Sequence, residues 1–173
     1  MKTMKTILRI VDRVSEWVGL TGRWIALALL VIVTVEVIRR YVFNSPTTWA
    51  YQASVILGGS LFILYWGYAE KLKTHIRIDL LYGRLSLRGK ALVDVLGFAI
   101  FFLPLFVALI KVSFSWMLWS WQTGEKMSTT IWYPPAAPFR AVAVIGLSLC
   151  LLQFLASFIR DLYTLIKGAK LAE

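Results

Sequence analysis

Glu36, Arg39 and Arg40 are the residues whose types and spacing could most readily do chemistry, because they follow a long uncharged apolar run. Separations of three and four residues place both arginines beside Glu36 on one face of a helix. The cluster could neutralise itself, with the arginines reaching toward lipid headgroups, or it could contact a partner subunit or a lipid phosphate. A proton-coupling role for Glu36 is a third interpretation, and neighbouring arginines argue against it because they favour a permanently ionised carboxylate.

Other polar and small residues are candidates for an interface with a partner or with lipid. Ser54 and Gly58 have the small-xxx-small spacing that lets another helix approach closely, either within this chain or from a second chain. Lys111 is an isolated charge late in an apolar run, which favours a side chain that reaches the headgroups over a specific ion pair. The full set of interface candidates is Glu36, Arg39, Arg40, Trp49, Ser54, Gly58, His75, Arg77 and Asp79.

Patterns that would indicate catalysis or cofactor binding are missing from the sequence. The single histidine, His75, excludes haem ligation by two histidines of this chain, and the single Cys150 forms part of no Cys/His cluster for another metal. The sequence has no phosphate-binding loop and no nucleophile–base motif. We therefore expect no enzyme activity and no cofactor.

Composition and apolar run lengths predict an all-α integral membrane protein. Hydrophobic residues make up 59% of the 173 residues and charged residues only 16%, more apolar surface than one soluble core of this size can bury. Four stretches approach the roughly 20 apolar residues that a membrane-spanning helix needs. We expect one membrane domain whose transmembrane helices are 24–43, 49–69, 91–117 and 139–160.

The segments between these spans are predicted to be short turns, surface helices and one longer loop. Helical spacing of apolar residues predicts an amphipathic helix over 1–23 that lies in the membrane interface, and a second interfacial segment over 70–90. The 44–48 segment is a tight turn in which Thr48 could cap the next helix. Prolines in the 118–138 loop predict an extended connection, and 161–173 form a tail.

The distribution of basic residues predicts the orientation in the membrane. The net charge of +10 could suggest nucleic-acid binding, but most of the 19 Lys and Arg residues fall in 1–23, 70–90 and the tail. On the other side of the predicted spans lie only Arg39, Arg40, Lys126 and Arg140. Basic residues concentrate on the cytoplasmic side, so both termini are expected there.

Three short motifs in order resemble the small membrane subunit of tripartite ATP-independent periplasmic (TRAP) transporters, the DctQ-like family. They are Arg40-Tyr-Val-Phe-Asn44, then Thr48-Trp-Ala50, then His75-Ile-Arg-Ile-Asp79, and the resemblance covers about residues 20–165. The family often has a glutamate three positions after that tryptophan, where this chain has Gln52, so a charge pair built on that carboxylate is in doubt here.

The resemblance implies a subunit role in the bacterial inner membrane. Such systems capture an organic anion, usually a carboxylate, with a periplasmic binding protein, and a large membrane subunit moves it inward with sodium. The small subunit would brace the scaffold of the large one, next to membrane lipids, and hold no substrate or sodium site itself. Because the sequence ends at Glu173, we expect the large subunit on a separate chain.

Two other interpretations are compatible with the residues. The first is a self-sufficient small exporter that couples to protons through Glu36. The second is a membrane-embedded enzyme or redox subunit, for which bound haem would be the sign. The 132–138 stretch of the outer loop is a candidate contact for the binding protein, or an ordinary connection stiffened by prolines.

Overall fold

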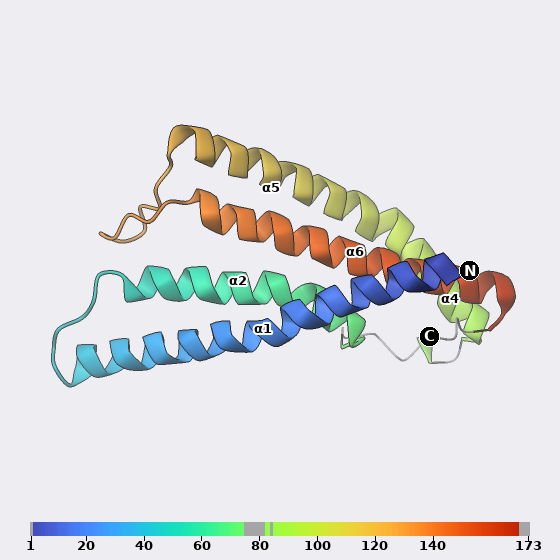
Figure 1. Cartoon of the computed structure of the whole chain (residues 1–173), viewed down its shortest axis with the longest axis horizontal. Helices are drawn as coiled ribbons and strands as arrows, with labels where there is room; N and C mark the ends of the chain where they lie inside the picture. Colours follow the sequence, from blue (N-terminus) through green and yellow to red (C-terminus); the bar gives the residue numbers. More distant parts are fainter. Residues whose placement is uncertain (1, 75–81, 84, 170–173) are drawn as a thin grey trace.

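The computed structural model describes residues 2–74, 82–83 and 85–169, and these residues are overwhelmingly helical, which confirms the predicted all-α fold. One isolated bridge between Lys126 and Pro135 is the only strand-like pairing among them. In chain order the elements are α1 (Lys2–Tyr41), α2 (Ala50–Lys71), α4 (Leu87–Gly97), the π-helical turn η1 (Phe98–Phe102), α5 (Leu103–Thr123) and α6 (Ala137–Lys167) (Figure 1).

Three of the helical stretches are long and apolar enough to cross a membrane. They are Thr3–Tyr41, Leu87–Thr123, which joins α4, η1 and α5, and Ala137–Lys167. Within the described residues, α2 does not reach the same hydropathy, although its 22 residues are long enough. Three of the four predicted spans are thus matched by suitable helices, and the crossing by α2 stays a prediction.

The π-helical turn has a physical cause in the sequence. Pro104 has no backbone N–H, so it cannot donate to the turn before it, and its ring crowds that turn. Just before it, the N–H of Leu103 bonds the carbonyl of Phe98, five residues back, instead of the usual four. The single wide turn lets the helix continue through the proline, as wide turns commonly do.

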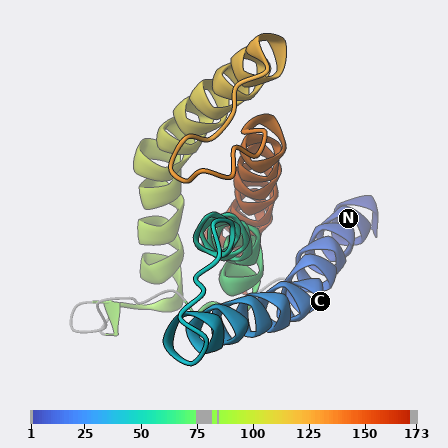
Figure 2. The ribbon, with the colours of Figure 1, turned by 90° about the vertical axis from the view of Figure 1, so that its left-hand side faces the viewer.

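The long helices form an open, curved row. Helix α2 packs against α1 on one side and α6 on the other, and α5 packs against α6. Seen end-on in Figure 2, α1 and α5 therefore lie at the two edges of the row, with α2 and α6 between them. Helix α1 begins at the same end of the molecule at which α6 ends (Figure 1).

Helices α2 and α6 approach each other closely at two glycines. A Cβ built on Gly146 of α6 would lie 3.0 Å from both the side chain and the backbone oxygen of Ile63. A Cβ on Gly67 of α2 would lie 3.4 Å from the backbone oxygen of Leu149. Small residues allow this proximity, and beside them lies an apolar core that includes Cys150.

Polar contacts hold the first half of α1 against α6. Gln153 is fully buried, its side-chain oxygen accepts from Ser15 at 2.7 Å, and its nitrogen donates to Asp12 at 2.9 Å. Arg160 forms an ion pair with Asp12. The predicted interfacial helix 1–23 and the first span are therefore one continuous helix, anchored to α6; its position in the membrane interface stays a prediction.

The close contact between α2 and α6 at Gly146 predicts a loss of stability when this glycine is replaced. Replacing Gly146 by Ala pushes a methyl group against the Ile63 backbone, which cannot rotate away, so we expect the free energy of unfolding to fall by about 1–3 kcal/mol. The measurement is equilibrium unfolding of the purified chain in mixed micelles. Gly97→Ala is the matched control, because a Cβ at Gly97 meets nothing within 4 Å. Equal stability of the two variants would contradict the close contact between α2 and α6 at Gly146.

Candidate functional site

The charged cluster of the first span is built around the carboxylate of Glu36. Arg40 donates to one carboxylate oxygen from two nitrogens, at 2.7 and 3.2 Å. The second oxygen accepts the backbone N–H of Thr47 at 3.1 Å and also the Thr47 hydroxyl. Glu36 is 9% exposed, and every one of these partners is a donor, as an ionised carboxylate requires. The carboxylate thus fastens the turn between α1 and α2.

The second arginine takes a different partner from the one that its spacing predicts. Arg39 donates to the backbone and side-chain oxygens of Ser45, both at 3.3 Å, and no bond joins it to Glu36. The chain reverses directly after α1, with Asn44 in the left-handed conformation, which asparagine tolerates well. That reversal brings Ser45 back to the end of the helix. Local helix spacing alone could not predict it.

The start of α2 differs by one residue from its predicted cap. Thr47, rather than Thr48, supplies the hydroxyl that accepts the N–H of Ala50, at 3.3 Å. The residue directly before α2 is Trp49, which makes no side-chain cap and is 40% exposed. The prediction for Thr48 is wrong because Glu36 holds Thr47 in place from the neighbouring helix, which is a tertiary contact.

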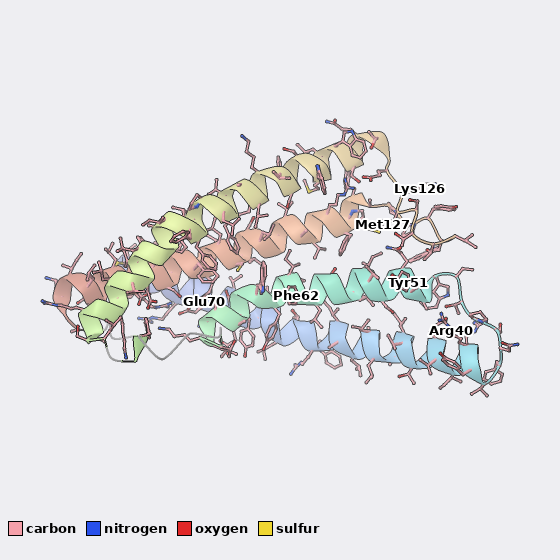
Figure 3. The ribbon with its side chains drawn as sticks, turned by 180° about the vertical axis from the view of Figure 1, so that it is seen from behind. Arg40, Tyr51, Phe62, Glu70, Lys126 and Met127 are labelled. Carbon is pink, nitrogen blue, oxygen red and sulfur yellow. The ribbon has the colours of Figure 1, made fainter. Side chains whose placement is uncertain are left out.

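Gln52 is buried under the loop that joins α5 and α6. Its exposed fraction is 4%, and its side-chain nitrogen contacts the sulfur of Met127 at 3.0 Å. Its side-chain oxygen has no hydrogen-bond partner among the described residues. Arg40, Tyr51 and Met127 lie at the same end of the molecule in Figure 3. Gln52 therefore packs within this chain and presents no charge to a partner.

The small residues of α2, from Ser54 to Gly59, contact different parts of the same chain. The Ser54 hydroxyl bonds the carbonyl of Ala50 in its own helix, at 2.8 Å. A Cβ on Gly58 would make ordinary contact with Leu29 of α1, at 3.9 Å, and one on Gly59 would press on Phe139 of α6. Gly58 and Gly59 thus lie beside α1 and α6 of the same chain, and a contact of these small residues with a second chain stays a prediction.

The remaining candidates are not part of this cluster. Lys111 is exposed on α5 and makes no ion pair with a described residue, and its contact with headgroups stays a prediction. His75, Arg77 and Asp79 lie outside the described residues, so their predicted role stays untested.

A protein-family model described as "Tripartite ATP-independent periplasmic transporters, DctQ component" matches residues 29–164. The chain belongs to this family. The match contains the Glu36 cluster, α2, α5 and most of α6, and it confirms the suspected resemblance. The DctQ family is one of transporter components and not of enzymes. No individually curated protein matches the chain.

A second ion pair, which local sequence spacing does not predict, joins the loop after α5 to α6. In the loop after α5, the carboxylate of Glu125 forms a bidentate ion pair with the guanidinium of Arg140 of α6, with N···O distances of 2.7 and 2.9 Å. Arg140 also donates to the carbonyl of Trp116 at 3.1 Å, and its guanidinium lies over the rings of Trp116 and Trp119. Fifteen residues separate the pair in the sequence, so no spacing rule could identify it.

The loop after α5 folds back on itself through two backbone hydrogen bonds before it reaches α6. The N–H of Met127 bonds the carbonyl of Pro134, and that of Ala136 bonds Glu125, both at 2.9 Å. Lys126 and Pro135 form an isolated bridge, residues 129–132 between them form bends, and none of the loop residues 125–136 is helical. The helices on either side are longer than predicted: α5 runs to Thr123, and Pro138 lies in the first turn of α6, where a missing N–H costs nothing.

The Glu36 cluster predicts a local effect on the turn between α1 and α2. Glu36→Ala removes the acceptor of Arg40 and Thr47, so we expect faster amide hydrogen exchange from Thr47 through the first turn of α2. Hydrogen-exchange mass spectrometry measures it. Arg39→Ala is the control, because its contacts with Ser45 are long and exposed, and it should leave α2 protected. Unchanged exchange in Glu36→Ala would mean that the carboxylate does not hold the turn.

Proposed function

We propose that this chain is the small permease subunit of a sodium-coupled TRAP transporter that takes up an organic anion, with a carboxylate as the expected substrate class. It braces the scaffold of a large transport subunit on a separate chain, beside a periplasmic binding protein, and it holds no substrate site itself. The observation that carries this proposal is the family match over residues 29–164.

The shape of the helical row supports a bracing role. Both edge helices present long apolar faces, with Leu30 of α1 63% exposed and Leu105 of α5 55% exposed. An open row leaves more apolar side-chain area available to lipid or to other helices than a closed bundle would. A partner scaffold could pack along such a face through shape complementarity, which drives helix association in lipid.

We further propose four crossings of the bacterial inner membrane, with α2 as the fourth and both termini in the cytoplasm. Helix α2 packs between α1 and α6, which are both long and apolar enough to cross a membrane, so part of its surface is shielded from lipid. Helix α1 begins and α6 ends at one end of the molecule, and the basic excess is on the segments at that end.

A self-sufficient exporter that uses Glu36 is the alternative. The geometry favours the subunit role, because Arg40 and Thr47 already occupy both carboxylate oxygens of Glu36. A transport assay on this chain alone, reconstituted in vesicles, separates the two functions: proton-driven transport without a second subunit would support the exporter.

Coexpression with the large subunit tests the proposed role directly. We expect the two chains to purify together at one-to-one stoichiometry in mild detergent, and uptake to be lost when this chain is deleted. Stoichiometry from mass spectrometry of the purified complex and uptake of labelled substrate by cells are the measurements. Separate elution of the chains, with uptake that survives the deletion, would refute the subunit role.

Arg40 is the residue of the outer cluster that we expect to matter for assembly. Its side chain is 51% exposed although it is paired with Glu36, so its guanidinium has donors left for a partner or a lipid phosphate. Arg40→Ala should lower the yield of complex or the uptake rate by several-fold, and Arg40→Lys should restore part of it. Lys111→Ala is the control, an exposed charge on α5. Equal complex yield and uptake in wild type and Arg40→Ala would refute this role.

A further inference from the structure

Two adjoining cavities lie at the end of the molecule where α2 ends and α4 begins, opposite the Glu36 cluster. One is polar and has a volume of about 730 Å³; the other is largely apolar and has a volume of about 440 Å³. They share Tyr82, Asp94, Ser157 and Asp161 as lining residues, so they lie side by side, and the two together are called the hollow. Glu70, labelled in Figure 3, marks the apolar part.

The polar cavity carries charges of both signs. Two of its cations already have partners, since Lys71 pairs with Glu16 of α1 and Arg160 pairs with Asp12. The other two, Lys73 and Lys90, form no ion pair with a described residue, and the Lys90 ammonium lies over the ring of Tyr82. A lysine ammonium group that is not engaged in an ion pair can bind a phosphate group.

Acidic groups stand beside these lysines in the same hollow. Asp94 accepts a hydrogen bond from the Tyr82 hydroxyl at 2.5 Å, and both residues line the two cavities. Asp161 is on the facing helix α6 and also lines both. Asp94 and Asp161 already have contacts within the chain, but a carboxylate can accept from several donors at once, so both can also receive an ammonium group. The cavity therefore presents complementary charges for a phosphate and an amine in one ligand.

The apolar cavity is walled by a cluster of phenylalanines. Phe102 lies 4.4 Å from Phe154 between ring centroids, and Phe98 lies 5.0 Å from Phe158. Gly97 completes the wall, and a Cβ at that position would meet nothing within 4 Å. An acyl chain could lie in this space without moving the backbone, since apolar surface is what a hydrocarbon chain buries favourably.

We propose that the hollow binds one phospholipid whose headgroup carries both a phosphate and an ammonium group, as in phosphatidylethanolamine. Lys73 and Lys90 hold the phosphate, Asp94 and Asp161 face the ammonium, and the start of one acyl chain lies between the phenylalanines and Gly97. The lipid comes from the leaflet at the basic end of the molecule, which is the inner one in the proposed orientation. The binding itself depends on neither the orientation nor the large subunit.

Titration of the purified full chain with single lipids tests this site. Native mass spectrometry in mild detergent gives the dissociation constants for phosphatidylethanolamine and for phosphatidylglycerol, which has no ammonium group. We expect phosphatidylethanolamine to bind more tightly, and Lys73→Ala and Lys90→Ala each to weaken it by about tenfold, as the loss of a charge-assisted hydrogen bond does. Lys126→Ala, at the opposite end of the molecule, is the matched control and should bind normally.

A second pair of variants tests the acyl-chain space without removing any charge. Gly97→Leu fills the cavity from a position that is open in the folded chain, so it should block binding while the protein stays folded. Gly97→Ala adds only a methyl group and should bind as the wild type does. Thermal unfolding of both variants checks their fold. Equal affinity of Gly97→Leu and Gly97→Ala for phosphatidylethanolamine, or equal affinity of the wild type for the two lipids, would overturn the proposal.

Discussion

The close approach of α2 and α6 at Gly67 and Gly146 is the constraint on which the rest of the arrangement depends. Lipid tails are as apolar as the helix surfaces, so helices in a membrane associate through tight packing and hydrogen bonds rather than through the hydrophobic effect. Here a side chain at either glycine would meet the backbone of the other helix. The crossing therefore keeps α2 and α6 together as the middle of the row, and α1 and α5 add to its two sides.

Charged and polar contacts hold the row together at its ends, where apolar packing alone would leave the segments free. At one end Glu36 holds the turn after α1 and Arg140 holds the loop after α5. At the other end Asp12 pairs with Arg160, and Gln153 is enclosed between α1 and α6. Most of these polar groups bond each other, which a low-dielectric surrounding demands of any group that is buried in it.

This distribution of charge explains why a bracing role suits the chain better than a pathway. A transport pathway needs polar groups that can exchange partners with a substrate or an ion, whereas the carboxylate of Glu36 and the pair of Glu125 with Arg140 are held by bonds within the chain. The surfaces that stay open are the apolar faces of the edge helices and the hollow beside Lys73 and Lys90. The chain belongs to a family of tripartite transporter components, which implies a larger membrane subunit as a partner for the open apolar faces.

Composition and apolar run lengths determined that this is a helical membrane protein, and ordered short motifs indicated its family, because both are properties of residues that are near each other in the chain. The same local rules predicted the turn at 44–48 and the pairing of Arg40 with Glu36, four residues apart. They did not predict the partner of Arg39, the cap by Thr47 or the ion pair between Glu125 and Arg140. Partners there are set by how the chain reverses or by a neighbouring helix. Only the tertiary structure decided which glycines bring two helices together, because Gly58 and Gly146 differ in what faces them and not in chemistry.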